Sequence, residues 1–160
     1  FDKPPALTLE GFLKTGDNPT CFGAGMAWHR RLTDTFGRLP PGSRNMDFLY
    51  PLRGLMLTGA AFCNEPLLDW RRHGGNMTLV FQQDDADNEF DKLQVHERNL
   101  LNKMANWHGA IEDAQRLAQA TGNQAPLNAV ANAAVQHIVK LMGQWRPVRH
   151  RLAQAKVGVY

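Results

Sequence analysis

The chain has 160 residues, 43% hydrophobic and 21% charged, which is the composition of a globular domain with a real core. The formal net charge of +3 is too small to indicate a nucleic-acid partner, and no apolar run of about eighteen residues or more is present to span a membrane. Because the sequence starts with Phe1 rather than Met, we expect it to be part of a longer or processed chain. Cys21 and Cys63 form no Cys-x-x-Cys pair, so we expect small buried side chains in a reducing compartment and no metal site.

The first predicted elements are a short helix and a strand. Thr8 is a typical N-cap, and residues 8–16 end in a glycine, which predicts a helix over this range. Residues 20–28 have the apolar character of a strand. Within that segment Gly23 and Gly25 indicate close approach of the backbone to another strand or to a ligand.

Two more helices are predicted downstream. Residues 30–36 fit a short helix that stops at Gly37. Residues 39–45 contain Pro-Pro-Gly and predict a loop. Residues 47–58 then carry an apolar stripe at helical spacing and end at Gly59. Short strand-like pieces follow at residues 60–63 and 66–70.

The C-terminal part is helical throughout. Apolar residues recur at spacings of three and four in two runs, at residues 93–118 and 127–152. Gly122 suits the end of one helix and Pro126 the start of the next, so we expect an antiparallel helical hairpin. In that hairpin Trp107 and Trp145 should meet at one level, and Pro147 should kink the second helix.

These patterns predict an α/β fold class, with short strands and helices followed by a long antiparallel helical hairpin. The expected organisation is an α/β part over residues 1–81, an acidic linker over 82–88 and the hairpin over 89–160.

The order of motifs between residues 46 and 78 resembles a known family. An acid starts an amphipathic helix, and a glycine, a short strand, Glu-Pro-Leu and an aromatic-Arg-x-His segment follow. This order resembles the C-terminal, acceptor-side half of an inverting GT-A glycosyltransferase of family 2, of the bacterial surface-polysaccharide type, over roughly residues 6–79. The chain departs from the family in two places: Met46-Asp47 stands where Glu-Asp is usual, and Trp70-Arg71-Arg72-His73 where Tyr-Arg-x-His is usual.

The resemblance implies a role for each candidate site residue. Asp47 would be the catalytic base that takes the proton of the acceptor hydroxyl, and His73 would be a metal ligand. Arg71 and Arg72 would neutralise the leaving nucleoside diphosphate. The other substrate-binding residues would be Gly23, Gly25, Trp28 and Trp70.

Each residue also has a structural interpretation, which the sequence leaves open. Asp47 could simply complement the dipole at a helix start, and His73 could be structural. The two arginines could be exposed in a surface loop, and Trp28 could belong to the core.

The family's Asp-x-Asp motif for metal and nucleotide does not precede this region, and the acids of Asp85-Ala-Asp87 belong to the linker. We therefore expect the nucleotide-binding half to lie outside this chain, with a divalent metal (Mn²⁺ or Mg²⁺) in the full-length enzyme. We expect the fragment alone to bind no metal and to be inactive. The implied partners are a nucleotide sugar and a glycan or lipid-linked acceptor, with no nucleic acid. We expect the protein in the cytoplasm, where it could also lie at the inner face of the membrane.

The basic tail has five cations and no acid, at Lys140, Arg146, Arg149, Arg151 and Lys156. It suggests peripheral contact with a membrane, and the hairpin offers a surface for a homo-oligomer. The alternative function is a non-catalytic binding or assembly module that uses the hairpin for association. A nucleic-acid binder based on this tail lacks a recognised motif.

Overall fold

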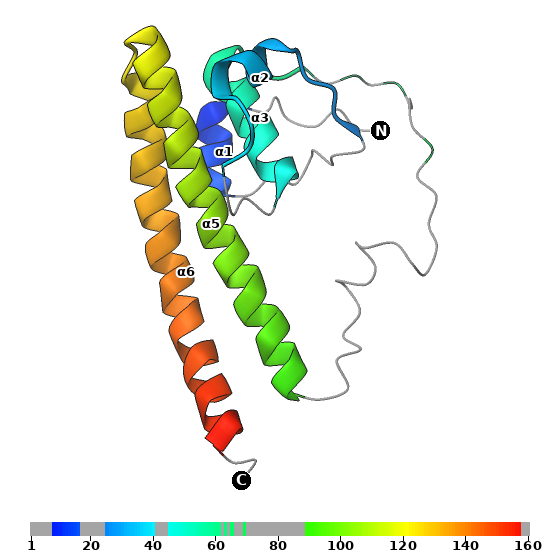
Figure 1. Cartoon of the computed structure of the whole chain (residues 1–160), viewed down its shortest axis with the longest axis vertical. Coiled ribbons are helices and arrows are strands. Elements are labelled where there is room, and N and C mark those ends of the chain that lie inside the picture. Colours follow the sequence, from blue (N-terminus) through cyan, green and yellow to red (C-terminus); the bar gives the residue numbers. More distant parts are fainter. Residues whose placement is uncertain are drawn as a thin grey trace.

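The computed structural model describes residues 8–16, 25–40, 45–61, 63, 65, 69 and 89–157. These residues form five helices: α1 (Leu9–Thr15), α2 (Arg31–Phe36), α3 (Met46–Leu57), α5 (Glu89–Thr121) and α6 (Ala125–Val157). The two long helices lie side by side, and the three short ones pack against the half of this hairpin nearest its turn (Figure 1).

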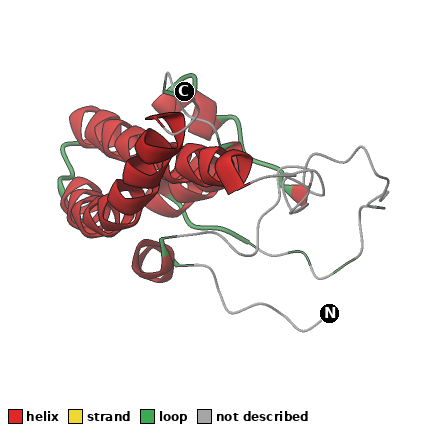
Figure 2. Ribbon diagram, turned by 90° about the horizontal axis from the view of Figure 1, so that it is seen from below, coloured by secondary structure: helices red, strands yellow, loops and turns green. Residues whose placement is uncertain are grey.

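The predicted α/β fold is wrong for the described part of the chain. Helices make up 80% of it and it contains no strand, so it is mainly helical (Figure 2). Residues 26–28 and the exposed residues 60 and 61, all expected in strands, have no regular structure. A strand needs a partner that completes its hydrogen bonds, and the short helices instead bury their apolar faces against α5 and α6.

The short helices begin and end where the sequence predicts. The Thr8 hydroxyl accepts a hydrogen bond from the Gly11 N–H (3.1 Å), and Gly16 closes α1 in the left-handed conformation, with φ at 69°. Asn45 caps α3 by accepting from the Asp47 N–H at 2.9 Å. Helix α3 therefore starts with a fixed first turn, and Asp47 lies in that turn.

The predicted antiparallel hairpin is confirmed. Gly122, with φ at 74°, ends α5 and donates its N–H to the Ala118 carbonyl at 2.8 Å. The Asn123 side chain then accepts from the Ala125 N–H at 3.0 Å and starts α6. The helix α6 continues through Pro147 to Val157.

The pairing expected between Trp107 and Trp145 is wrong. The Trp107 ring stacks on His137, with centroids 4.7 Å apart and planes 7° from parallel. The Trp145 indole N–H instead donates to Glu97 at 3.2 Å. Trp145 lies about six residues further from the turn than Trp107 does, roughly 9 Å of helix, so the two cannot share a level.

Two groups of buried apolar residues stabilise the fold. The larger joins α1, α2 and α3 to the turn-proximal half of the hairpin, around Phe12, Phe48 and Trp107. The Phe48 ring packs edge-on to Trp107 at 5.2 Å and tilted to Phe12 at 5.1 Å. The smaller group closes the far half of the hairpin between Leu100 and Leu152.

Among the described helices, none combines the length and apolar character that crossing a membrane requires. The expectation that cysteines are buried fails at Cys63, which is a free and exposed thiol. Cys21 lies outside the described residues.

Candidate functional site

The candidate base, Asp47, lies at the rigid start of α3. It is half-buried, and its own N–H is held by the Asn45 side chain. Phe48 follows Asp47 in α3, and its ring is buried against Trp107 of α5. This contact anchors the first turn of α3 to α5. The backbone of Asp47 is therefore fixed, which suits a residue whose side chain must meet one hydroxyl.

An aromatic pair lies one helical turn beyond Asp47. The Trp28 ring stacks on Tyr50 with centroids 4.3 Å apart and planes 13° from parallel. Asp47 and Tyr50 are separated by three positions in α3, so their side chains are neighbours on one side of the helix. Trp28 remains 40% exposed, which excludes the core interpretation of this tryptophan. The structure thus brings two residues predicted from distant parts of the sequence to one edge of α3.

A buried ion pair between Arg53 of α3 and Asp113 of α5 lies next to the Tyr50 ring. Arg53 and Asp113 are both fully buried, with Nε to Oδ2 at 2.7 Å and Nη2 to Oδ1 at 2.9 Å. The same guanidinium donates to the Gly37 and Arg38 carbonyls, each at 3.1 Å, and lies 5.5 Å from the centre of the Tyr50 ring. It therefore joins α3, α5 and the segment after α2, and it supports the ring on which Trp28 rests.

The electrostatics of this pair are dominated by burial. Burial raises the pKa of Asp113 above its usual value, although the hydrogen bonds and charge of Arg53 and the charge of Arg116 act in the opposite direction. Burying these two charges carries an unfavourable desolvation free energy, and the contribution of the pair to the structure is to fix the position of α3 on α5.

The remaining predicted site residues are placed as follows. Gly25 is exposed, and a Cβ built there meets no described atom within 4 Å, so no neighbouring strand explains this glycine. Five of the residues fall outside those that the structure describes, namely Gly23, Trp70, Arg71, Arg72 and His73. Over the described residues alone, no group of three or more His, Cys, Asp or Glu side chains is placed to hold a metal ion.

Sequence reasoning missed the residues that support the site. Tyr50 could have been found from its spacing, because it follows Asp47 by three positions in a predicted helix. Arg53 could also have been found, because a single cation on an otherwise apolar helix face predicts a buried partner of opposite charge. Nothing in the sequence pointed to Asp113 as that partner, because the two residues are separated by sixty positions.

No protein-family model matches the chain, and no curated protein or solved structure matches it either.

Proposed function

We propose that the chain is the acceptor-side part of an inverting glycosyltransferase of family 2, whose nucleotide-binding half lies outside it. The observation that carries the proposal is the grouping at α3. Asp47 sits in the fixed first turn, and the Trp28–Tyr50 stack lies one turn further along the same helix. A carboxylate beside an exposed aromatic face suits a sugar, because the apolar C–H face of a sugar ring packs on the aromatic ring while its hydroxyls reach polar groups.

In the proposed reaction Asp47 accepts the proton of the acceptor hydroxyl as its oxygen attacks the anomeric carbon of the donor. A new C–O bond forms on one face while the bond to the diphosphate breaks on the other, which inverts the configuration. The electron pair leaves with the nucleoside diphosphate, and Arg71 and Arg72 are its proposed partners. Trp28 and Tyr50 hold the acceptor ring in position for this attack.

The resemblance implies a divalent metal, Mn²⁺ or Mg²⁺, with His73 as its ligand on this side. When bound, such a metal would neutralise charge on the diphosphate. His73 lies outside the described residues, and those residues offer no metal cluster. The steps assigned above to Asp47, Trp28 and Tyr50 do not involve the metal.

The direct test uses the full-length protein with Asp47→Asn. Nucleoside diphosphate release is measured from a panel of uridine, guanosine and thymidine diphosphate sugars, with Mn²⁺ or Mg²⁺ and an extract of surface glycans as acceptor. Loss of the base should lower the rate by roughly a hundredfold to ten-thousandfold. Asp34→Asn is the matched control, because Asp34 is an exposed carboxylate on α2. Equal activity of both variants would refute a catalytic role for Asp47.

The outward face of α6 supports a second element of the proposal, peripheral contact with the inner face of an anionic membrane in the cytoplasm. Val135 and Val139 are 61% and 64% exposed, and Met142 follows on the same face. Arg146 lies one turn further on, and α6 contains no acidic residue. An exposed apolar stripe that continues into an exposed cation is typical of a helix that lies in a lipid interface.

Vesicle flotation distinguishes this contact from self-association of the hairpin, which is the alternative binding function. We expect the protein to float with vesicles that contain anionic lipid, and Val139→Asp to abolish flotation. A protein that instead sediments as a dimer, with the dimer lost in Val139→Asp, would favour the assembly module. Three exposed side chains are far fewer than the roughly 20–30 residues that each partner contributes to a standard interface, so we expect a monomer.

A further inference from the structure

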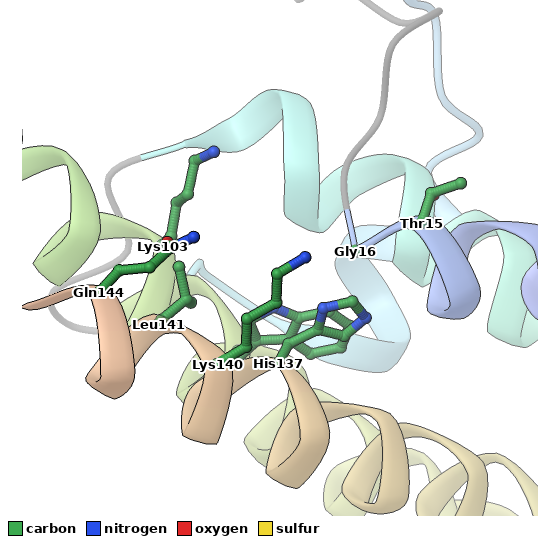
Figure 3. A pocket seen from close by; sticks show the side chains of 8 residues that line it. Thr15, Gly16, Lys103, His137, Lys140, Leu141 and Gln144 are labelled. Atoms are coloured by element: carbon green, nitrogen blue, oxygen red, sulfur yellow. The ribbon is translucent and has the colours of Figure 1, made fainter.

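A small hollow with a cationic rim lies where α1, α5 and α6 meet. Its volume is about 170 Å³, and its lining includes Gly16, Lys103, Trp107, His137, Lys140 and Gln144 (Figure 3). The residues come from the end of α1 and from both helices of the hairpin, and α1 is distant from these two in sequence. The hollow is therefore a product of the tertiary fold and is not a groove along one helix.

The His137 side of the hollow is held rigidly. The imidazole stacks on the buried Trp107 ring, and its Nε2 lies 2.8 Å from the Leu13 carbonyl oxygen. A carbonyl oxygen only accepts, so Nε2 carries the proton and donates it. Gly16 approaches so closely that a Cβ there would lie 2.3 Å from the ring. The wall around His137 therefore admits no additional side chain.

The rim has positive charge with no acid to balance it. Lys103 and Lys140 extend from facing helices, and within the described residues neither forms an ion pair. No carboxylate lines the hollow. At the other end of the hairpin two cations have acidic partners: Arg149 pairs with Glu97, and Arg151 with Glu89. Two ammonium groups that share one hollow repel each other, and an anion between them would remove this repulsion.

One wall of the hollow, the Trp107 ring, packs against Phe48 in the first turn of α3, the turn that also holds Asp47. Phe48 packs on Trp107 and Arg53 pairs with Asp113, so α3 and α5 run in the same direction at this register. Lys103 precedes Trp107 by about one turn of α5, which brings it alongside the first turn of α3. The positive end of the α3 dipole adds to the field at this place.

We propose that this hollow binds a phosphate or diphosphate group of the acceptor, with Lys103 and Lys140 as its cations and Gln144 as a neutral donor. The assignment of this anion to the acceptor rests on the proposed function. The two ammonium groups hold the anion at the edge where Asp47 receives the acceptor hydroxyl. Binding of the anion itself does not require transfer activity.

Calorimetric titration of the full-length protein with inorganic pyrophosphate, in the presence of a chelator, tests the site. Lys103→Gln with Lys140→Gln should weaken binding at least about tenfold, because two charge-assisted contacts are lost. Lys92→Gln with Arg98→Gln is the charge-matched control, since both residues are exposed on α5 away from the hollow. Unchanged binding in the Lys103/Lys140 variant, or no binding by the wild-type protein, overturns the proposal. An equal loss in the control variant also overturns it, because the effect would then be one of net charge.

A long-chain alkyl diphosphate separates the two sources of the anion. Tighter binding of this compound than of pyrophosphate, lost in the Lys103/Lys140 variant, assigns a lipid-linked acceptor. Equal binding of the two, with the same loss, assigns a soluble phosphorylated acceptor.

The site and the proposed function fail in different assays. If the wild-type protein transfers no sugar from any nucleotide sugar of the panel while the Lys103/Lys140 variant loses pyrophosphate binding, the anion site stands and the transferase proposal falls. If transfer depends on Asp47 while the lysine variant binds pyrophosphate normally, the anion site falls alone.

Discussion

Replacing Arg53 by Met should destabilise the protein by about 3–5 kcal/mol, because it leaves the Asp113 carboxylate buried without its main partner. Both side chains have no exposed surface, and two hydrogen bonds of 2.7 and 2.9 Å join them. Among the described residues a second cation remains near Asp113, namely Arg116, with Nη1 at 3.7 Å from Oδ1. The Gly37 carbonyl also loses its guanidinium donor, but Gly37 is exposed and water can replace that bond.

The double variant Arg53→Met, Asp113→Leu separates the cost of an orphaned charge from the value of the pair. Removing both charges should cost far less than the sum of the single changes, with a coupling of at least about 2 kcal/mol. Arg116→Met is the control: its side chain is 41% exposed, so we expect a loss of at most about 1 kcal/mol.

Urea denaturation followed by far-ultraviolet circular dichroism measures all four proteins, and equal m-values confirm that one transition is compared. A loss below about 1 kcal/mol for Arg53→Met, or strict additivity in the double variant, would refute the reasoning. Either result would mean that water reaches the pair in solution.

Three further predictions concern stability. Gly16→Ala should cost about 1–3 kcal/mol, because φ is +69° and the new Cβ would lie 2.3 Å from His137, whereas Gly25→Ala should be nearly neutral in the same melts. Trp107→Ala should cost about 3–5 kcal/mol, since the ring is buried between α3 and α6. Trp145 is only half-buried, so its replacement should cost about 1 kcal/mol, and equal losses would contradict the register described here. Finally, burial raises the pKa of Asp113, so its protonation favours the folded state. Its contribution is then fully present below the usual pKa of 3.8 and is lost as pH rises through the folded pKa. Denaturation at several pH values should show that the free energy of unfolding of the wild-type protein falls relative to that of Asp113→Asn as pH rises. A wild-type protein that gains stability relative to Asp113→Asn as pH rises would refute the direction of the shift.

The sequence by itself determined the local features of this protein. Thr8 and Gly16 bound α1, and Gly122 ends α5, because caps depend only on neighbouring backbone groups. The three-and-four spacing predicted the hairpin, since helical periodicity is likewise a local property. The sequence also singled out Asp47 and Trp28 as candidate site residues. The assignments to Arg71, Arg72 and His73 remain predictions from the same motif.

Only the tertiary structure decided what depends on distant partners. A strand exists when another strand completes its hydrogen bonds, and an apolar run does not reveal whether such a partner is present, so the α/β prediction failed. The register that places Trp107 on His137 depends on the turn and on packing along both helices. The contacts of Trp28 with Tyr50 and of Arg53 with Asp113 join segments that the sequence separates. Periodicity tells which face of a helix is buried, and only the folded chain determines which residue that face meets.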